Sequence, residues 1–325
     1  MAEKMEPGMK QPWPGEEGLI PVTDGSAGDS NLITRRYLDS ILVEMRILGT
    51  KEADTTFELW GRTFSSPIMT PAFSHLNKAL KNGRKPMEEY AQAAKNLNLV
   101  NWVGMEPDEE FNEIVKTGAA TVRIIKPFAD HQLILDQIHY AEEHGAFAVG
   151  IDIDHSIGTD GNYDNVDGNP LGPITLEDLK TFASSTDLPF VAKGVLSVRD
   201  ALICRDAGVK GVFISHHHGR MKYAVPPVQI LQEIAPALKG SGMKIFVDCH
   251  IDSGQDAYKA LASGADAVSA GRVILPGLLK EGTSAVEKVL TKMNRELKEM
   301  MGYTSVRNLS EFDPSVLIQN GKHLG

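Results

Sequence analysis

The chain has 325 residues, of which 42% are hydrophobic and 23% are charged, as in globular proteins with a large buried core. One α/β barrel accommodates this length, because such barrels commonly run to about 250 residues and become longer with extensions. The formal net charge of −10 excludes a general basic surface for nucleic acid. An anionic ligand would therefore have to bind in a local basic pocket.

The two cysteines, Cys204 and Cys249, do not form a CxxC pair, so neither a disulfide framework nor a thiolate zinc site is expected. A reducing cytoplasm is the simplest location for such a chain. The N-terminal segment is polar and lacks the apolar core of a signal peptide. No apolar stretch approaches the roughly 18 residues of a membrane span, so no membrane association is expected.

Three features precede the main pattern. Residues 1–30 are rich in Gly, Pro and acidic side chains, which predicts a flexible arm. Apolar residues at helical spacing predict a helix over residues 31–48. Residues 56–68 (TFELWGRTFSSPI) predict a short hairpin that turns at Gly61 and Arg62.

From Pro67 onward, short apolar segments alternate with longer amphipathic ones, which predicts strands followed by helices. The short segments are apolar on both faces, as parallel strands covered on both sides are. Their ranges are 67–72, 98–105, 120–127, 147–154, 189–194, 211–217, 244–250 and 267–272. Strict alternation favours a closed (β/α)8 TIM barrel over an open sheet, and no Gly-x-Gly-x-x-Gly follows the first strand. Residues 31–325 are predicted to form this single domain.

Other local signals support the same organisation. Gly145, Gly208 and Gly264 end amphipathic segments just before a strand, as left-handed helix stops do. Residues 284–301 predict a strong final helix. Residues 155–174 form a long polar connection on the side where barrel active sites lie, and they are either a lid or a disordered insertion.

Polar residues at the carboxyl ends of barrel strands point into the mouth of the barrel. The candidates are Asp152, Asp154, Lys193, the run from Ser215 to Arg220 (SHHHGR), Asp248, Cys249, His250, Gly271 and Arg272. A histidine there is a natural general base near neutral pH. If the run is extended, His216 and His218 share one side and His217 faces the other. A metal site is the alternative, formed by His155, His217, His250, Asp154 and Asp252.

Two segments carry a resemblance to a known family. LPFVAKGVLSVRDALICRDAGVKGVFISHHHGR and DCHIDSGQDAYKALASGADAVSAGR resemble the FMN-dependent α-hydroxy-acid oxidases and dehydrogenases. The first is similar to that family's fifth-strand lysine and its Ser-Asn-His-Gly-Gly-Arg motif. The second is similar to the family's Asp-Gly-Gly-x-Arg-x-Gly segment and following Gly-Arg. The resemblance is clearest over residues 188–309, and it implies an FMN cofactor, a small anionic substrate and a homo-oligomer, expected to be a tetramer.

The resemblance also implies roles for individual residues. Lys193 would lie beside the flavin ring, His217 would be the active-site base, and Arg220 would bind the substrate carboxylate in a bidentate manner. Asp152 would orient and charge the histidine. The residues implied to contact FMN are Thr70, Pro71, Ala72, Lys193, Ser215, His217, Asp248, His250, Gly271 and Arg272.

Several positions depart from the family pattern. Asp252 stands at the second phosphate-binding arginine, and Cys249 and His250 replace two glycines. The third-strand Gln-x-Tyr is represented by Arg123 and the two residues after it, and the arginine expected in the connection after the fourth strand is missing. FMN binding is therefore better supported by the sequence than the substrate is.

Three functional hypotheses follow. In the first, His217 removes a proton while a hydride equivalent passes from the Cα of a 2-hydroxy acid to flavin N5. The second keeps FMN but changes the reaction, as in type 2 isopentenyl diphosphate isomerases. The third is a barrel without flavin, which binds another ligand or a metal.

Overall fold

The computed structural model describes residues 25–78, 80 and 82–324, and a barrel of eight parallel strands forms its centre. The strands are β4 (Ile68–Met69), β5 (Val100–Val103), β6 (Ala120–Ile125), β7 (Ala148–Asp152), β10 (Phe190–Val195), β11 (Gly211–Ile214), β12 (Lys244–Val247) and β13 (Ala267–Ser269). Each lies within or overlaps one of the eight predicted segments. Neighbours in the sheet run β4-β13-β12-β11-β10-β7-β6-β5, which is chain order around a cylinder.

The two ends of this series meet and close the barrel. The backbone of Phe73 pairs in parallel with that of Val103, just beyond β4. The amide of Thr70 donates to the carbonyl of Val100 at 3.2 Å, and the amide of Gly104 donates to the carbonyl of Phe73 at 2.7 Å. The predicted (β/α)8 barrel is therefore confirmed.

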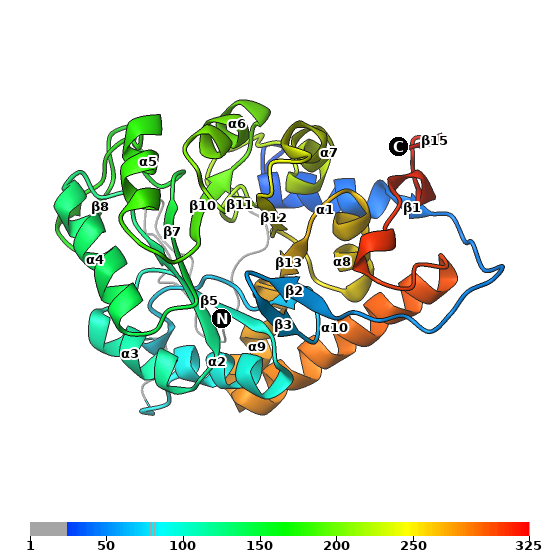
Figure 1. The fold of residues 1–325 in the computed structure, drawn as a ribbon, viewed down its shortest axis with the longest axis horizontal. Coiled ribbons are helices and arrows are strands. Elements are labelled where there is room, and N and C mark those ends of the chain that lie inside the picture. Colours follow the sequence, from blue (N-terminus) through cyan, green and yellow to red (C-terminus); the bar gives the residue numbers. More distant parts are fainter. Residues whose placement is uncertain (1–24, 79, 81, 325) are drawn as a thin grey trace, which may run out of the picture.

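Helices surround the barrel and follow its strands along the chain (Figure 1). They are α2 (Pro86–Leu97), α3 (Asp108–Lys116), α4 (His131–Glu143), α5 (Leu176–Ser184), α6 (Val198–Asp206), α7 (Pro227–Leu238), α8 (Gly254–Ala262), α9 (Leu275–Glu281) and α10 (Thr283–Tyr303). The last of these confirms the helix predicted over 284–301. Gly145, Gly208 and Gly264 have φ angles of +82°, +81° and +107°, so the predicted left-handed stops are also confirmed.

Apolar side chains fill the inside of the barrel in a packed layer. They include Val100, Trp102, Val122, Ile124, Val191, Phe213 and Phe246, all nearly inaccessible to solvent. The hairpin of β2 (Phe57–Leu59) and β3 (Arg62–Phe64) plugs the end where the strands begin (Figure 1). Trp60 packs at a tilt against Phe147, at 5.7 Å, and edge-to-face against Phe246, at 5.9 Å, measured between ring centroids. The turn lies at Trp60 and Gly61, one residue earlier than predicted.

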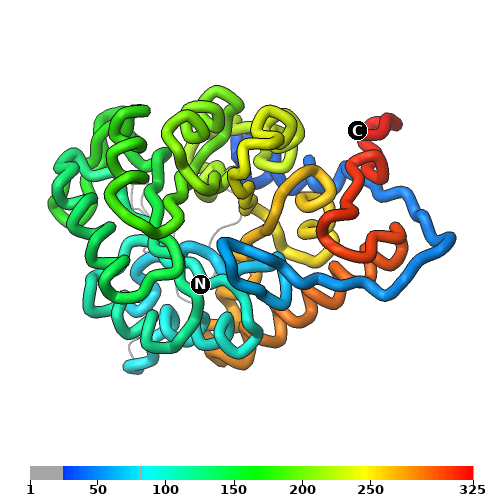
Figure 2. The backbone as a smooth tube through the Cα atoms, in the orientation of Figure 1, coloured from blue at the N-terminus to red at the C-terminus, as the bar shows by residue number. Residues whose placement is uncertain are grey.

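The N-terminal helix is shorter than the sequence predicts. Helix α1 (Ser30–Ser40) ends where Ile41 adopts an extended backbone, and β1 (Leu42–Val43) follows. Here the apolar periodicity is overridden by pairing with β14 (Leu317–Gln319), which pairs in turn with β15 (Lys322–His323). Figure 2 shows the red end of the chain beside this blue segment. The predicted arm over residues 1–30 lies outside the described residues as far as Asp24, and residues 25–29 lead directly into α1.

Short helical turns complete the described structure. They are η1 (Leu76–Lys78), η2 (Arg272–Ile274), η3 (Leu309–Glu311) and η4 (Pro314–Val316). The connection over residues 155–174 is ordered and contains a small hairpin of β8 (Asn165–Val166) and β9 (Asn169–Pro170). The connection is therefore not a disordered insertion, and its role as a lid stays a prediction.

Truncation of the hairpin plug should destabilise the barrel. Leu59 is fully buried against the barrel interior, so Leu59→Ala is expected to lower the free energy of unfolding by about 2 to 5 kcal/mol. Glu58→Ala, on the exposed face of the same strand, should change it by less than about 0.5 kcal/mol. Urea unfolding measures both. Equal losses in the two variants would show that the plug contributes nothing through burial.

Candidate active site

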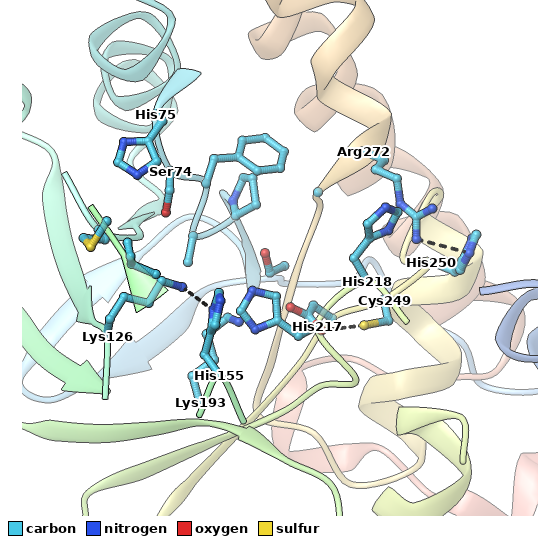
Figure 3. Close-up of a pocket in the computed structure, with 18 of the residues that line it drawn as sticks. Ser74, His75, Lys126, His155, Lys193, His217, His218, Cys249, His250 and Arg272 are labelled. Carbon is cyan, nitrogen blue, oxygen red and sulfur yellow. Dashed lines mark hydrogen bonds between the residues drawn. The ribbon is translucent and has the colours of Figure 1, made fainter. Parts of the chain in front are cut away.

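A cavity of about 420 Å³ opens where the barrel strands end (Figure 3). The predicted site residues that line it are Pro71, Ala72, Lys193, His217, Asp248, His250, Gly271 and Arg272. The other predicted residues lie just outside this lining: Thr70, Asp152, Ser215 and Arg220. The hydroxyl of Thr70, for example, donates to Asn101 Oδ1 at 2.7 Å inside the barrel wall. Figure 3 shows two basic ends, one around His217 and one around Arg272.

The carboxylate of Asp152 is buried between two ammonium groups at the His217 end. Lys126 Nζ lies 2.6 Å from Asp152 Oδ2, and Lys193 Nζ lies 3.1 Å from Asp152 Oδ1. Burial alone would raise the pKa of Asp152, but attraction from Lys126 and Lys193 holds it well below its usual value. Burial opposes the charge on Lys193 as well, yet the nearby carboxylates raise the pKa of Lys193 above its usual value. The site therefore keeps a buried carboxylate and its cations ionised together.

His217 is bonded to a different carboxylate from the one the sequence suggested. Its Nδ1 lies 3.1 Å from Asp154 Oδ1 and 3.8 Å from Asp152 Oδ1. Burial raises the pKa of Asp154, but attraction to His217 lowers it below its usual value. An ionised carboxylate only accepts, so Nδ1 carries a hydrogen and Nε2 is the ring nitrogen left to exchange a proton with a ligand. Gly194, with φ at +90°, permits this approach, because a Cβ there would lie 2.3 Å from Asp154 Cγ.

The three consecutive histidines do not alternate as predicted. His217 and His218 have φ angles of +47° and +61°, so this part of the run is a left-handed turn and not an extended segment. Both line the cavity as a result. His216 faces away, where its Nε2 lies 2.8 Å from Thr34 Oγ1 and its Nδ1 accepts from the amide of Gly219 at 2.9 Å.

Arg220 is held by the connection that follows β7. Its Nη2 donates to the carbonyl of Ile157 at 2.9 Å and lies 3.2 Å from Asp164 Oδ2. Its Nε is buried without a hydrogen-bond partner in the described part of the chain. Arg220, the predicted anchor for the substrate carboxylate, therefore lies close to the cavity but is paired with the carboxylate of Asp164.

Helix α1 joins the loops at the other end of the cavity. Arg272 Nη2 donates to Asn31 Oδ1 at 2.6 Å and lies 3.3 Å from His250 Nε2. The side-chain amide of Asn31 also donates to the carbonyl of His218 at 3.1 Å, and Arg35 donates to the carbonyl of His250 at 3.2 Å. The helix thus positions three basic residues that line one end of the cavity, which suits a phosphate group.

The departures from the family pattern near Arg272 have partners of their own. Asp252 lines the cavity, but its Oδ2 lies 3.1 Å from His250 Nδ1 and 3.8 Å from Arg35 Nη1. Cys249 and His250 adopt φ angles of +68° and +62°, although they replace glycines. Asp248 accepts from the thiol of Cys249 at 2.9 Å. Cys249 and His250 therefore adopt the left-handed backbone that glycine adopts most readily.

Sequence reasoning missed several residues of the cavity wall. Lys126 follows the third barrel strand at its carboxyl end, so the rule that selected Lys193 would also have found it. Arg123 was matched to the family's substrate shell, but its guanidinium lies over the Phe111 ring on the outer side of the barrel. The other lining residues outside the predicted FMN set include Phe73, Ser74, His75, Met105, His155 and Val166. The sequence marked His155 only as a possible metal ligand and Val166 only as part of a possible lid, and it gave no signal for the other four.

The metal alternative can be compared with the observed geometry. Asp152, His155 and His217 offer ligand atoms that all lie within 4.8 Å of one another. The ammonium of Lys126 already contacts two of them, Asp152 Oδ2 at 2.6 Å and His155 Nδ1 at 3.0 Å. A divalent cation among these atoms would meet that positive charge at close range. This geometry favours an ionic network over a metal centre.

The profile of the FMN-dependent dehydrogenase family matches residues 21–173 and 165–319. This chain belongs to that family. A 4-hydroxymandelate oxidase from Amycolatopsis orientalis is 27% identical over 314 residues, which cover 86% of this chain and 87% of that protein. A 2-hydroxyacid oxidase from Dictyostelium discoideum is 24% identical over 314 residues, covering 87% and 80%. A solved mandelate oxidase variant with an FMN adduct superposes with a TM-score of 0.82 at 26% identity, covering 95% of this chain and 96% of that one.

The chain is therefore an FMN-dependent oxidoreductase, as the first hypothesis states, and the family match does not favour the isomerase alternative. The cavity of this family member suits the cofactor. Its volume of about 420 Å³ lies within the range of ligand pockets. Arg272 supplies a guanidinium at one end, beside His250, and Lys193 supplies a buried cation at the other. Gly271 adds no side chain to the wall between them, where a Cβ would meet only Pro71, at 3.9 Å.

The buried His216 makes stability depend on pH. Burial, with the charges of His250 and Arg272, lowers its pKa to about 4, and protonation of Nδ1 would break its bond from the Gly219 amide. This contribution to stability is complete above a pH of about 6.5 and is lost as the pH falls towards 4. In urea titrations, His216→Asn should show a shallower loss over this window than the parent protein. His139→Asn, at an exposed position of α4, is the matched control, and parallel curves for His216→Asn and the parent would refute the assignment.

Proposed function

We propose that this enzyme oxidises a small 2-hydroxy acid to the corresponding 2-oxo acid with FMN as the oxidant. The observation that carries the proposal is His217, a cavity-facing imidazole whose Nδ1 is bonded to Asp154 beside the buried cation Lys193. Two relatives are named 4-hydroxymandelate oxidase and 2-hydroxyacid oxidase, which supports the same class of substrate.

His217 would act as the base through Nε2. It accepts a proton from the substrate, and the negative charges of Asp154 and Asp152 stabilise the imidazolium that forms. FMN, when bound, supplies the two-electron oxidation by accepting a hydride equivalent at N5. The buried ammonium of Lys193 offsets negative charge that develops in the cavity. Because these groups are already in place, little reorganisation is required during the reaction.

The cofactor contacts follow the two ends of the cavity. We propose that Lys193 and the backbone of Pro71 and Ala72 border the flavin ring. Thr70 would hold this segment in place through the hydrogen bond from its hydroxyl to Asn101. Arg272, Gly271 and His250 would hold the phosphate. Asp248 and Ser215 are also proposed to contact FMN. The hydroxyl of Ser215 accepts a hydrogen bond from the amide of His217 at 3.0 Å.

The substrate carboxylate is proposed to bind Arg220, whose planar guanidinium suits a two-oxygen anion. For this to occur, Asp164 must release Arg220. The connection over residues 155–174 would then act as a lid, since Val166 also lines the cavity.

Assembly and location are further parts of this proposal. Exposed apolar side chains at Leu42, Met45 and Leu48, the last 96% exposed, support a homo-oligomer, and the resemblance to the family suggests a tetramer. Cys204 and Cys249 are both unpaired, which supports a reducing, cytoplasmic location. Among the described helices, none combines the length and apolar character needed to cross a membrane. The net charge of −10 gives no support to a nucleic-acid partner.

Anaerobic mixing of the yellow enzyme with 2-hydroxy acids tests the function directly. A substrate should bleach the flavin, and His217→Ala should slow the bleaching by about 10²- to 10⁴-fold, because the base is lost. Stopped-flow absorbance measures the rate, and His139→Ala serves as the histidine control. A protein that no 2-hydroxy acid reduces, or a His217→Ala variant with the parent rate, would contradict the proposal.

Removal of the lid carboxylate should favour substrate binding. Asp164→Asn weakens the partly exposed ion pair with Arg220, so KM should fall about 2- to 5-fold while kcat changes little. Asp160→Asn, at an exposed position of the same connection, is the matched control. An unchanged or higher KM in Asp164→Asn would show that Asp164 does not compete for Arg220.

A further inference from the structure

We infer that Lys126 is a second anchor for the substrate carboxylate, in addition to Arg220. This assignment rests on the proposed oxidation of a 2-hydroxy acid and adds a residue to the substrate-binding part of that site. It concerns a cation that faces the cavity in the observed arrangement, whereas Arg220 is turned to Ile157 and Asp164.

Lys126 lies directly after β6, where the barrel opens into the cavity, and only 6% of the residue is exposed. An ammonium group has three donor hydrogens. Two are directed to Asp152 Oδ2 at 2.6 Å and His155 Nδ1 at 3.0 Å. Lys126 lines the cavity and has no third hydrogen-bond partner among the described residues, so the remaining donor is available to a ligand there. A buried cation with one donor left is suited to a carboxylate oxygen.

His155 aims this ammonium. Burial, with the charges of Lys126 and Arg220, lowers the pKa of His155 to about 3, so its ring is neutral at physiological pH. Lysine only donates, so His155 Nδ1 must accept and the ring hydrogen lies on Nε2. Nε2 lies 3.5 Å from Asp164 Oδ2. The Asp152 carboxylate and the His155 imidazole therefore fix Lys126 without occupying every donor it has.

Lys126 and His217 share two neighbours, Asp152 and His155. The rings of His155 and His217 are 5.4 Å apart between centroids, and both histidines reach within 4.8 Å of the Asp152 carboxylate. The ammonium of Lys126 contacts two members of this group. In a 2-hydroxy acid the carboxylate is bonded to the carbon that reacts. A carboxylate on Lys126 would thus keep the reacting carbon near His217.

Lys126 also offsets the acidic side chains around the site. Asp152, Asp154 and Asp164 all lie nearby, and an incoming carboxylate would be repelled by each of them. Lys126 lines the cavity and contacts Asp152, so it screens that charge from the ligand while donating to it. Lys193 contacts the same carboxylate through Oδ1, and it is assigned to the flavin.

The test compares charged and uncharged ligands in the FMN-loaded enzyme. Pyruvate and phenylglyoxylate, with their amides pyruvamide and phenylglyoxylamide, are titrated while the shift of the flavin spectrum is followed. Lys126→Met should weaken binding of the acids about 10- to 100-fold and leave binding of the amides within about 2-fold. A role in folding alone would not change the preference for acid over amide. Equal preferences in the parent protein and Lys126→Met would overturn the assignment.

Two further variants distinguish a carboxylate anchor at Lys126 from a role in folding or in FMN binding. Lys126→Gln keeps a hydrogen-bond donor of similar reach, so it should bind the acids more tightly than Lys126→Met. If Lys126→Met does not fold, Lys126→Gln is used in its place. The affinity for FMN, measured by fluorescence quenching, should be unchanged in Lys126→Met and Lys126→Gln. Lys193→Met, which also removes a cation from Asp152, is the matched control and should weaken FMN binding instead.

The same titrations separate failure of the anchor from failure of the proposed oxidation. If the parent binds the acids through Lys126 but no 2-hydroxy acid bleaches the flavin, the proposed oxidation fails while the carboxylate anchor remains. If neither acid is preferred over its amide by the parent, the anchor fails.

Discussion

The buried carboxylate of Asp152 and its two lysines are the interaction on which the rest of the site depends. A lone ionised carboxylate at that depth would be strongly destabilised, and either lysine alone would be an uncompensated buried cation. Lys126 and Lys193 come from strands on either side of β7 in the barrel, so the closed sheet itself brings the three groups together. His217 approaches the same carboxylate from the next strand beyond Lys193. The charge network therefore surrounds His217 with charges that are fixed before any ligand enters.

The two aspartates near His217 make different interactions with it. Asp154 forms the hydrogen bond with His217 and determines which nitrogen carries the proton. Asp152 is committed to the lysines and acts on His217 only through its charge, from 3.8 Å. The same network extends through Lys126 and His155 to Asp164, in the connection over residues 155–174, and from Asp164 to Arg220. The position of this connection is thus linked to the cations Lys126 and Arg220.

At the Arg272 end of the cavity, two residues with side chains adopt a backbone that favours glycine. Cys249 and His250 keep left-handed conformations that favour glycine, and each such residue carries a conformational cost of roughly 1 kcal/mol or more. The contacts of α1 with the His218 and His250 carbonyls and with Arg272 hold this arrangement. An N-terminal helix outside the barrel therefore helps to form one end of the cavity.

The sequence by itself determined the barrel, its eight strands and most of the residues at the strand ends. It could do so because apolar periodicity is local, and because parallel strands deliver their last residues to one mouth. It did not determine that α1 ends at Ser40, since that depends on pairing with a strand from the other end of the chain. Nor did it determine that Asp154 contacts His217, which lies 63 residues away, or that Asp164 forms an ion pair with Arg220. Left-handed turns at His217 and His218 redirect those side chains, and contacts between distant loops select their partners, so only the tertiary structure could decide them.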